Sequence, residues 1–97
     1  MTEFETVVST IRQLKPELAS RFGCNSIGLF GSIVRDDFSS SNSDIDIIVD
    51  FSRPIGAEFI DMAEFLESVM KRKVDLVSRG GIKSRYLNTI EADIVYV

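Results

Sequence analysis

The sequence has no histidine and only one cysteine, and these shortages exclude several kinds of active site. Without histidine, neither a Ser-His-Asp triad nor a Cys-His nucleophile can form, and no metal can have a histidine ligand. Cys24 alone can form neither an internal disulfide nor a multi-cysteine zinc site, and we expect it to be a small buried apolar residue. A bound metal would therefore have oxygen ligands, which favours a hard cation such as Mg²⁺.

The sequence also lacks long apolar runs and an excess of basic residues. No run approaches the length of a membrane span, and residues 1–5 do not begin a basic-then-apolar signal peptide, so we expect a cytoplasmic protein without membrane contact. The 11 lysines and arginines and the 15 aspartates and glutamates give a formal net charge of −4. Proteins that hold long nucleic acids usually present a basic face, so nucleic acid is not an expected partner.

Basic residues are nevertheless concentrated in the C-terminal third of the chain. They begin with Lys71-Arg72-Lys73 and continue with Arg79, Lys83 and Arg85. We interpret them as a solvated surface, because such charges usually face water. The alternative is a docking patch for an acidic partner or for a triphosphate.

The length and the periodicity predict the fold. A chain of 97 residues suggests one domain, residues 1–97, around one modest core. Alternating apolar residues and short apolar runs predict strands at 27–30, 44–50, 73–77 and 94–97. Apolar residues at helical spacing predict helices at 2–14, 59–70 and 83–91, the last with Tyr86, Leu87 and Ile90 inward. Together they predict an α/β fold, a small mixed sheet with helices mainly on one face.

Two local signals refine this prediction. Thr2 and Glu5 have the spacing of a capping box, which predicts the start of the first helix. Pro16 should kink that helix or begin a second short one, which would end near Gly23. Residues 36–43 are polar and predict a loop.

Three aspartates are candidates for the chemistry. Asp44 and Asp46 lie two apart on a predicted strand, so their carboxylates point to the same face and repel each other unless a cation lies between them. Asp75 lies in another predicted strand among apolar residues. If the two strands are neighbours, three carboxylates could hold two divalent ions about 4 Å apart, as in phosphoryl chemistry. The alternative is that these are solvated surface acids.

Gly31 and Ser32 directly follow a predicted buried strand. If Ser32 begins a helix, its exposed amides favour phosphate, and glycine lets the backbone approach the ligand closely. Arg35 would then share a helical face with Ser32 and reach the same phosphates. The alternative is an ordinary strand-to-helix turn with a serine cap. The pattern is not a Walker loop, because the glycine and lysine spacing is absent.

The three motifs in this order resemble the minimal nucleotidyltransferase (MNT) family of the DNA polymerase beta-like superfamily. They are Leu29-Phe30-Gly31-Ser32-Ile33-Val34-Arg35, Ser43-Asp44-Ile45-Asp46-Ile47-Ile48-Val49 and Val74-Asp75-Leu76-Val77. The resemblance covers nearly the whole chain and implies a fold like the palm of polymerase beta. In family motifs, alanine and glycine often stand where this sequence has Val34 and Asp36.

The resemblance also implies a function. Asp44, Asp46 and Asp75 match the family's metal-binding and catalytic carboxylates, and Gly31, Ser32 and Arg35 match its triphosphate-binding residues. It implies two Mg²⁺ ions with a bound nucleoside triphosphate, ATP being the expected substrate. Family members commonly act as the antitoxin of a HEPN-domain toxin and transfer AMP to a tyrosine of it. The alternative, a binding module that only masks the toxin, stays open, as do the base preference, the acceptor and a homo-oligomeric state.

Overall fold

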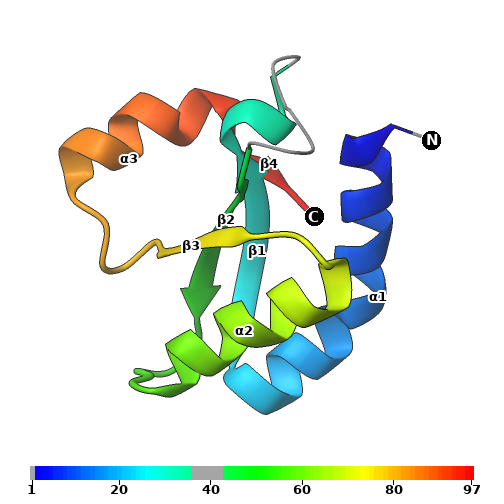
Figure 1. Cartoon of the computed structure of the whole chain (residues 1–97). Coiled ribbons are helices and arrows are strands. Elements are labelled where there is room, and N and C mark those ends of the chain that lie inside the picture. Colours follow the sequence, from blue (N-terminus) through cyan, green and yellow to red (C-terminus); the bar gives the residue numbers. More distant parts are fainter. Residues whose placement is uncertain (1, 36–42) are drawn as a thin grey trace.

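The computed structural model describes residues 2–35 and 43–97 and shows a four-stranded sheet between helices (Figure 1). The strands are β1 (Cys24–Phe30), β2 (Ile45–Phe51), β3 (Val74–Ser78) and β4 (Val95–Tyr96). The α-helices are α1 (Glu3–Phe22), α2 (Glu58–Met70) and α3 (Ser84–Ile90). Short 3-10 helices follow β1 and α3, namely η1 (Gly31–Ile33) and η2 (Glu91–Asp93). Most of the predicted polar loop lies outside the described residues.

The sheet is mixed, as predicted, with the strand order β3-β2-β1-β4. β1 runs antiparallel to both β2 and β4, whereas β2 and β3 are parallel. The register places Asp46 of β2 between Phe30 of β1 and Asp75 of β3. Because directly paired residues point to the same face of a sheet, these three side chains share one face.

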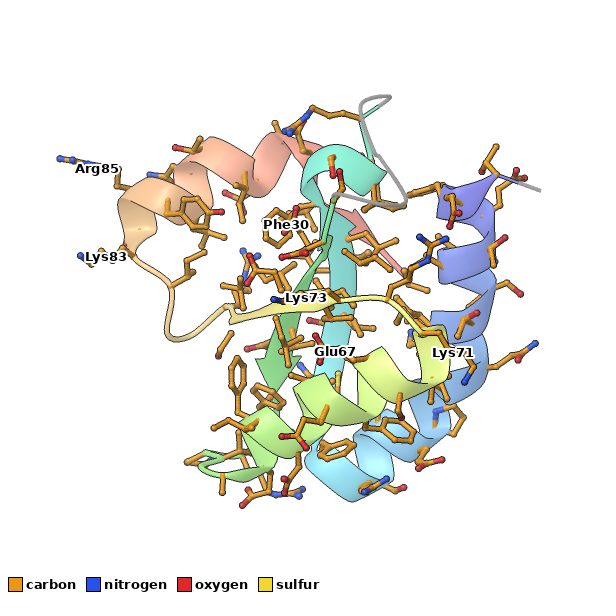
Figure 2. The ribbon with its side chains drawn as sticks, in the orientation of Figure 1. Phe30, Glu67, Lys71, Lys73, Lys83 and Arg85 are labelled. Atoms are coloured by element: carbon orange, nitrogen blue, oxygen red, sulfur yellow. The ribbon has the colours of Figure 1, made fainter. Side chains whose placement is uncertain are left out.

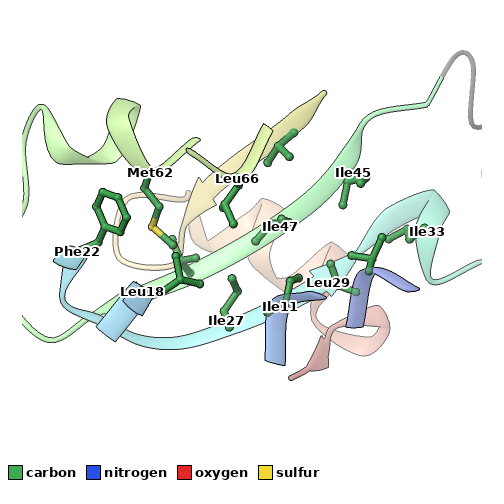
Figure 3. Close-up of a cluster of buried hydrophobic side chains, with 13 residues drawn as sticks. Ile11, Leu18, Phe22, Ile27, Leu29, Ile33, Ile45, Ile47, Met62 and Leu66 are labelled. Atoms are coloured by element: carbon green, nitrogen blue, oxygen red, sulfur yellow. The ribbon is translucent and has the colours of Figure 1, made fainter. Parts of the chain in front are cut away.

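Helices α1 and α2 cover the opposite face, and the main core lies between them and the sheet (Figure 3). Ile45, Ile47 and Val49 of β2 face this core and are buried. Ile11 and Leu18 of α1 pack against them, together with the buried residues of α2. Burial of this apolar surface is the dominant stabilising contribution to such a fold. In Figure 1, α3 lies on the side of the sheet away from α1 and α2.

Helix α1 begins at the predicted capping box. The Thr2 hydroxyl accepts a hydrogen bond from the Glu5 amide at 3.1 Å, and the Thr2 amide donates to the Glu5 carboxylate at 3.0 Å. Of the two outcomes expected at Pro16, a kink or a second short helix, the second does not occur, because α1 continues through Pro16 to Phe22. Apolar residues before and after Pro16 lie in the same core, and this packing outweighs the one hydrogen bond that proline removes.

Two further predictions need correction. Tyr86 does not face inward but is 47% exposed, and no residue of α3 is buried. Cys24 is half-buried rather than fully buried, and its thiol donates a weak hydrogen bond to the Ser26 carbonyl at 3.4 Å. Burial raises the pKa of the Cys24 thiol. Among the described helices, none combines the length and the apolar character that crossing a bilayer requires.

Candidate active site

Gly31 brings the end of β1 into contact with Asp46. The glycine begins η1 with φ 75°, a left-handed conformation that disfavours every residue with a Cβ. A Cβ at this position would lie 2.1 Å from Asp46 Oδ2 and 3.0 Å from its Cγ. Glycine is therefore needed here for two independent reasons, the backbone angle and the space that the carboxylate occupies.

The three predicted aspartates lie at one end of the parallel strand pair. Asp46 and Asp75 are register partners on β2 and β3, and Asp44 comes one residue before β2 begins. Asp46 is half-buried, whereas Asp44 and Asp75 are exposed. The condition for a shared site, that the two strands carrying these residues are neighbours, is met.

The environment of Asp46 disfavours its charged form. Burial next to Phe30, which is 3% exposed, removes water from the carboxylate and is the largest cause. Repulsion by the carboxylates of Asp75 and Asp44 and a hydrogen bond with Asp75 add to it, while the charge of Arg35 opposes it. Together they raise the pKa of Asp46 from 3.8 to about 6. A cation at this position would relieve the same repulsion.

The predicted helix at Ser32 is a single 3-10 turn, which ends at Ile33. Arg35 lies two residues beyond the end of this turn, so its role in binding the same phosphates as Ser32 stays a prediction. The Arg35 guanidinium lies 3.7 Å from the Asp93 carboxylate in η2. From this position its positive charge acts to lower the pKa of Asp46. Within residues 30–35 the backbone stays tight, since Val34 and Arg35 both donate to the Gly31 carbonyl at 3.1 Å.

The donor chemistry of this cluster fits a hard divalent cation, because every candidate ligand is a carboxylate or hydroxyl oxygen. Asp46 and Asp75 are close enough to share a hydrogen bond. Within residues 2–35 and 43–97, no three acidic or cysteine side chains converge closely enough to form a complete ligand set. An ion held here would have Asp46 and Asp75 as ligands, and Asp44 and phosphate oxygens would complete its shell.

Two further residues support the site, and the sequence pattern did not indicate them. Asp93 pairs with Arg35 and connects η2 to the turn after β1. Glu67 of α2 accepts a hydrogen bond from the Val74 amide at 2.9 Å, which fixes the start of β3 one residue before Asp75. The Arg35–Asp93 contact joins distant parts of the chain and has no local signature, whereas the Glu67–Val74 contact spans the short connection from α2 to β3. The half-buried position of Glu67 on an amphipathic helix is the feature that could have drawn attention to it.

Comparison with known proteins identifies the family. A model of the nucleotidyltransferase domain matches residues 11–97. The chain belongs to this family. It is 40% identical to the protein adenylyltransferase MntA of Thermococcus cleftensis over an alignment 98 residues long, which covers 100% of this chain and 98% of that protein. The resemblance inferred from the three motifs is thus confirmed.

Solved structures share the fold of this nucleotidyltransferase. A crystal structure of a toxin–antitoxin with AMP-PNP superimposes with a TM-score of 0.71 at 22% identity, covering 98% of this chain and 72% of that one. A tri-AMPylated Shewanella oneidensis HEPN toxin in complex with MNT antitoxin gives a TM-score of 0.60 at 21% identity, covering 96% of this chain and 66% of that one. At these identities the likeness establishes the fold, a mixed four-stranded sheet with three helices.

Proposed function

We propose that this nucleotidyltransferase is a Mg²⁺-dependent protein adenylyltransferase, which transfers AMP from ATP to a tyrosine hydroxyl of a HEPN-domain toxin and thereby acts as its antitoxin. The observation that carries the proposal is the contact between the Gly31 turn and Asp46, which is itself paired with Asp75. The Gly31 turn thus lies beside paired carboxylates, an arrangement that supports phosphate binding at the turn. The full-length similarity to an MntA adenylyltransferase supports the choice of AMP and of a protein acceptor.

The proposed reaction is an in-line displacement at the α-phosphorus of ATP. The acceptor oxygen forms a bond to that phosphorus, the bond to the bridging oxygen breaks, and pyrophosphate leaves. Asp75 would accept the proton of the attacking hydroxyl. Bound divalent ions, held by Asp44, Asp46 and Asp75, would neutralise charge on the phosphates.

The remaining site residues would bind the leaving group. The backbone of Gly31 and the hydroxyl of Ser32 would donate to the β- and γ-phosphates. Arg35 would add a charge-assisted contact from the same side. Most of the rate enhancement would then come from positioning and from charge neutralisation, because the chain supplies no covalent nucleophile in this scheme.

Intact mass spectrometry of the toxin tests the proposal. After incubation with this chain, ATP and Mg²⁺, the HEPN protein should gain about 329 Da per AMP, as expected for nucleotidyl transfer. Asp46→Ala should remove the adduct while the complex between the two proteins still forms. Asp50→Ala is the matched control, since Asp50 lies on the same strand and is also half-buried, but pairs with Ser26 instead of Phe30.

The same experiment distinguishes an enzyme that modifies the toxin from a binding module that only masks it. A masking module would inhibit the toxin without any adduct, and inhibition would survive Asp46→Ala. The absence of an adduct with all four nucleoside triphosphates, with Mg²⁺ and with Mn²⁺, together with surviving inhibition, would decide against the proposed transfer.

A further inference from the structure

The backbone at the start of β3 is fixed from both sides. On one side, the Lys73 carbonyl accepts a hydrogen bond from the Ile45 amide of β2 at 2.9 Å. On the other side, the next residue, Val74, donates its amide to the Glu67 carboxylate of α2 at 2.9 Å. The direction of the Lys73 side chain is therefore determined by two neighbours, although it lies just before the strand.

That direction leads to the face that carries the aspartates. Val74 is buried and Leu76 packs against the main core, so both face the helices. Lys73 and Asp75 alternate with them and face the other side. Two strand residues span roughly 6.6 Å, which the flexible stem of a lysine covers. In Figure 2, Lys73 lies at the start of β3, whereas Lys71 lies at the end of α2 near α1.

The Lys73 ammonium is available for a ligand. The side chain is exposed, and within residues 2–35 and 43–97 it makes no hydrogen bond or ion pair. Its neighbour Arg72 differs, because it pairs with Glu3 at 2.6 Å. On the face of the sheet that carries Asp46 and Asp75, the carboxylate face, Arg35 exerts its positive charge from the side of β1. Lys73 lies on the other side of this face, just before β3.

We propose that Lys73 is a further residue of the transfer site, which binds a phosphate of the nucleotide from the side opposite the Gly31–Ser32 turn. The inference rests on the proposed function, since it assumes that a nucleoside triphosphate occupies the carboxylate face. A lysine suits this position as a mobile point charge, which can follow the phosphate as its geometry changes during transfer.

Calorimetric titration with Mg²⁺ and AMP-PNP tests the proposal on the full chain. Lys73→Met should raise the dissociation constant about tenfold, the effect of one lost charge-assisted hydrogen bond. Lys73→Arg should restore most of the affinity, because it returns the positive charge. Lys71→Met is the matched control and should change the constant less than about twofold, since it removes the same charge from the end of α2 and not from the start of β3. Equal thermal midpoints would exclude unfolding.

A probe without phosphate distinguishes contact from structural support. The dissociation constant of adenosine is obtained by competition with AMP-PNP and corrected for the affinity of each protein for AMP-PNP. It should be the same for wild type and Lys73→Met. An equal loss for adenosine, or a Lys73→Met variant that binds AMP-PNP like wild type, would overturn the role of Lys73 and leave the proposed function intact. A wild-type chain that binds no AMP-PNP at all would overturn both.

Discussion

The two faces of β2 differ in charge and in the property that each should control. On the helix side, Ile45 and Ile47 are 0% exposed and carry the core. On the other side, Asp46 contacts the Gly31 turn and lies beside Asp75. Because side chains alternate along a strand, residues next to each other in sequence belong to different parts of the protein. Substitutions at neighbouring positions should therefore affect stability or nucleotidyl transfer, but rarely both.

The largest expected effect on stability is at Ile47. Ile47→Ala removes fully buried carbon atoms from the centre of the core and should lower the free energy of unfolding by about 2–5 kcal/mol. Ile47→Val should cost about 0.5–1.5 kcal/mol and gives a variant that stays folded. Urea denaturation followed by circular dichroism measures both changes. The rate of AMP transfer per folded molecule should stay near that of wild type.

The neighbouring position supplies the contrast. Asp46→Ala should abolish transfer without a comparable loss of stability, because the carboxylate is half-buried among like charges. If Ile47→Val lowered the transfer rate of the folded protein as strongly as Asp46→Ala, the separation of the two faces would be wrong.

The next largest effect is expected at Gly31, where the backbone meets the carboxylate face. Gly31→Ala should cost about 1–2 kcal/mol, because alanine disfavours the left-handed φ of 75°. It should also displace the Asp46 carboxylate, which a Cβ would approach to 2.1 Å, and weaken nucleotide binding at least about tenfold.

A second glycine provides the control for this substitution. A Cβ at Gly56 would meet no atom within 4 Å, so Gly56→Ala should leave nucleotide binding unchanged. Calorimetry with AMP-PNP and thermal denaturation compare the two variants. Normal binding by a folded Gly31→Ala protein would show that the turn does not position the phosphates.

The sequence predicted the carboxylate face well where alternation within a strand decides the outcome. The period of two puts Asp44 and Asp46 on one side of the chain, and the pairing of β2 with β3 puts Asp75 beside Asp46. The helix side was also predicted from a local period, since apolar residues recur at the spacing of an amphipathic helix.

The failures concern contacts that depend on register and on packing. Arg35 meets Asp93 because the C-terminal segment returns beside β1, and no local pattern encodes that return. Core residues before and after Pro16 stabilise α1 as one helix. The helix propensity of proline alone does not include this packing. The sequence indicated that Gly31 permits a close approach, but the register of β1 with β2 decides that Asp46 is what approaches.

The smallest expected effect is the pH dependence of the metal-free protein. Asp46 is an acid whose pKa rises from 3.8 to about 6 on folding. The folded state therefore holds the proton more tightly than the unfolded chain, and its stability should fall as the pH rises from about 4 to about 6. Above pH 6 the full penalty is present. We expect it to amount to only about 1 kcal/mol, because water screens a half-exposed carboxylate.

Asp46→Asn should remove this penalty. In EDTA at pH 7.5, which we choose to lie above the titration, the variant should be more stable than wild type by about the same 1 kcal/mol. At pH 4 the advantage should disappear, since wild-type Asp46 is then protonated and resembles asparagine in charge. Urea denaturation at the two pH values measures the difference. A gain of equal size at both pH values would mean that packing, rather than repulsion within the carboxylate pair, makes this position unfavourable.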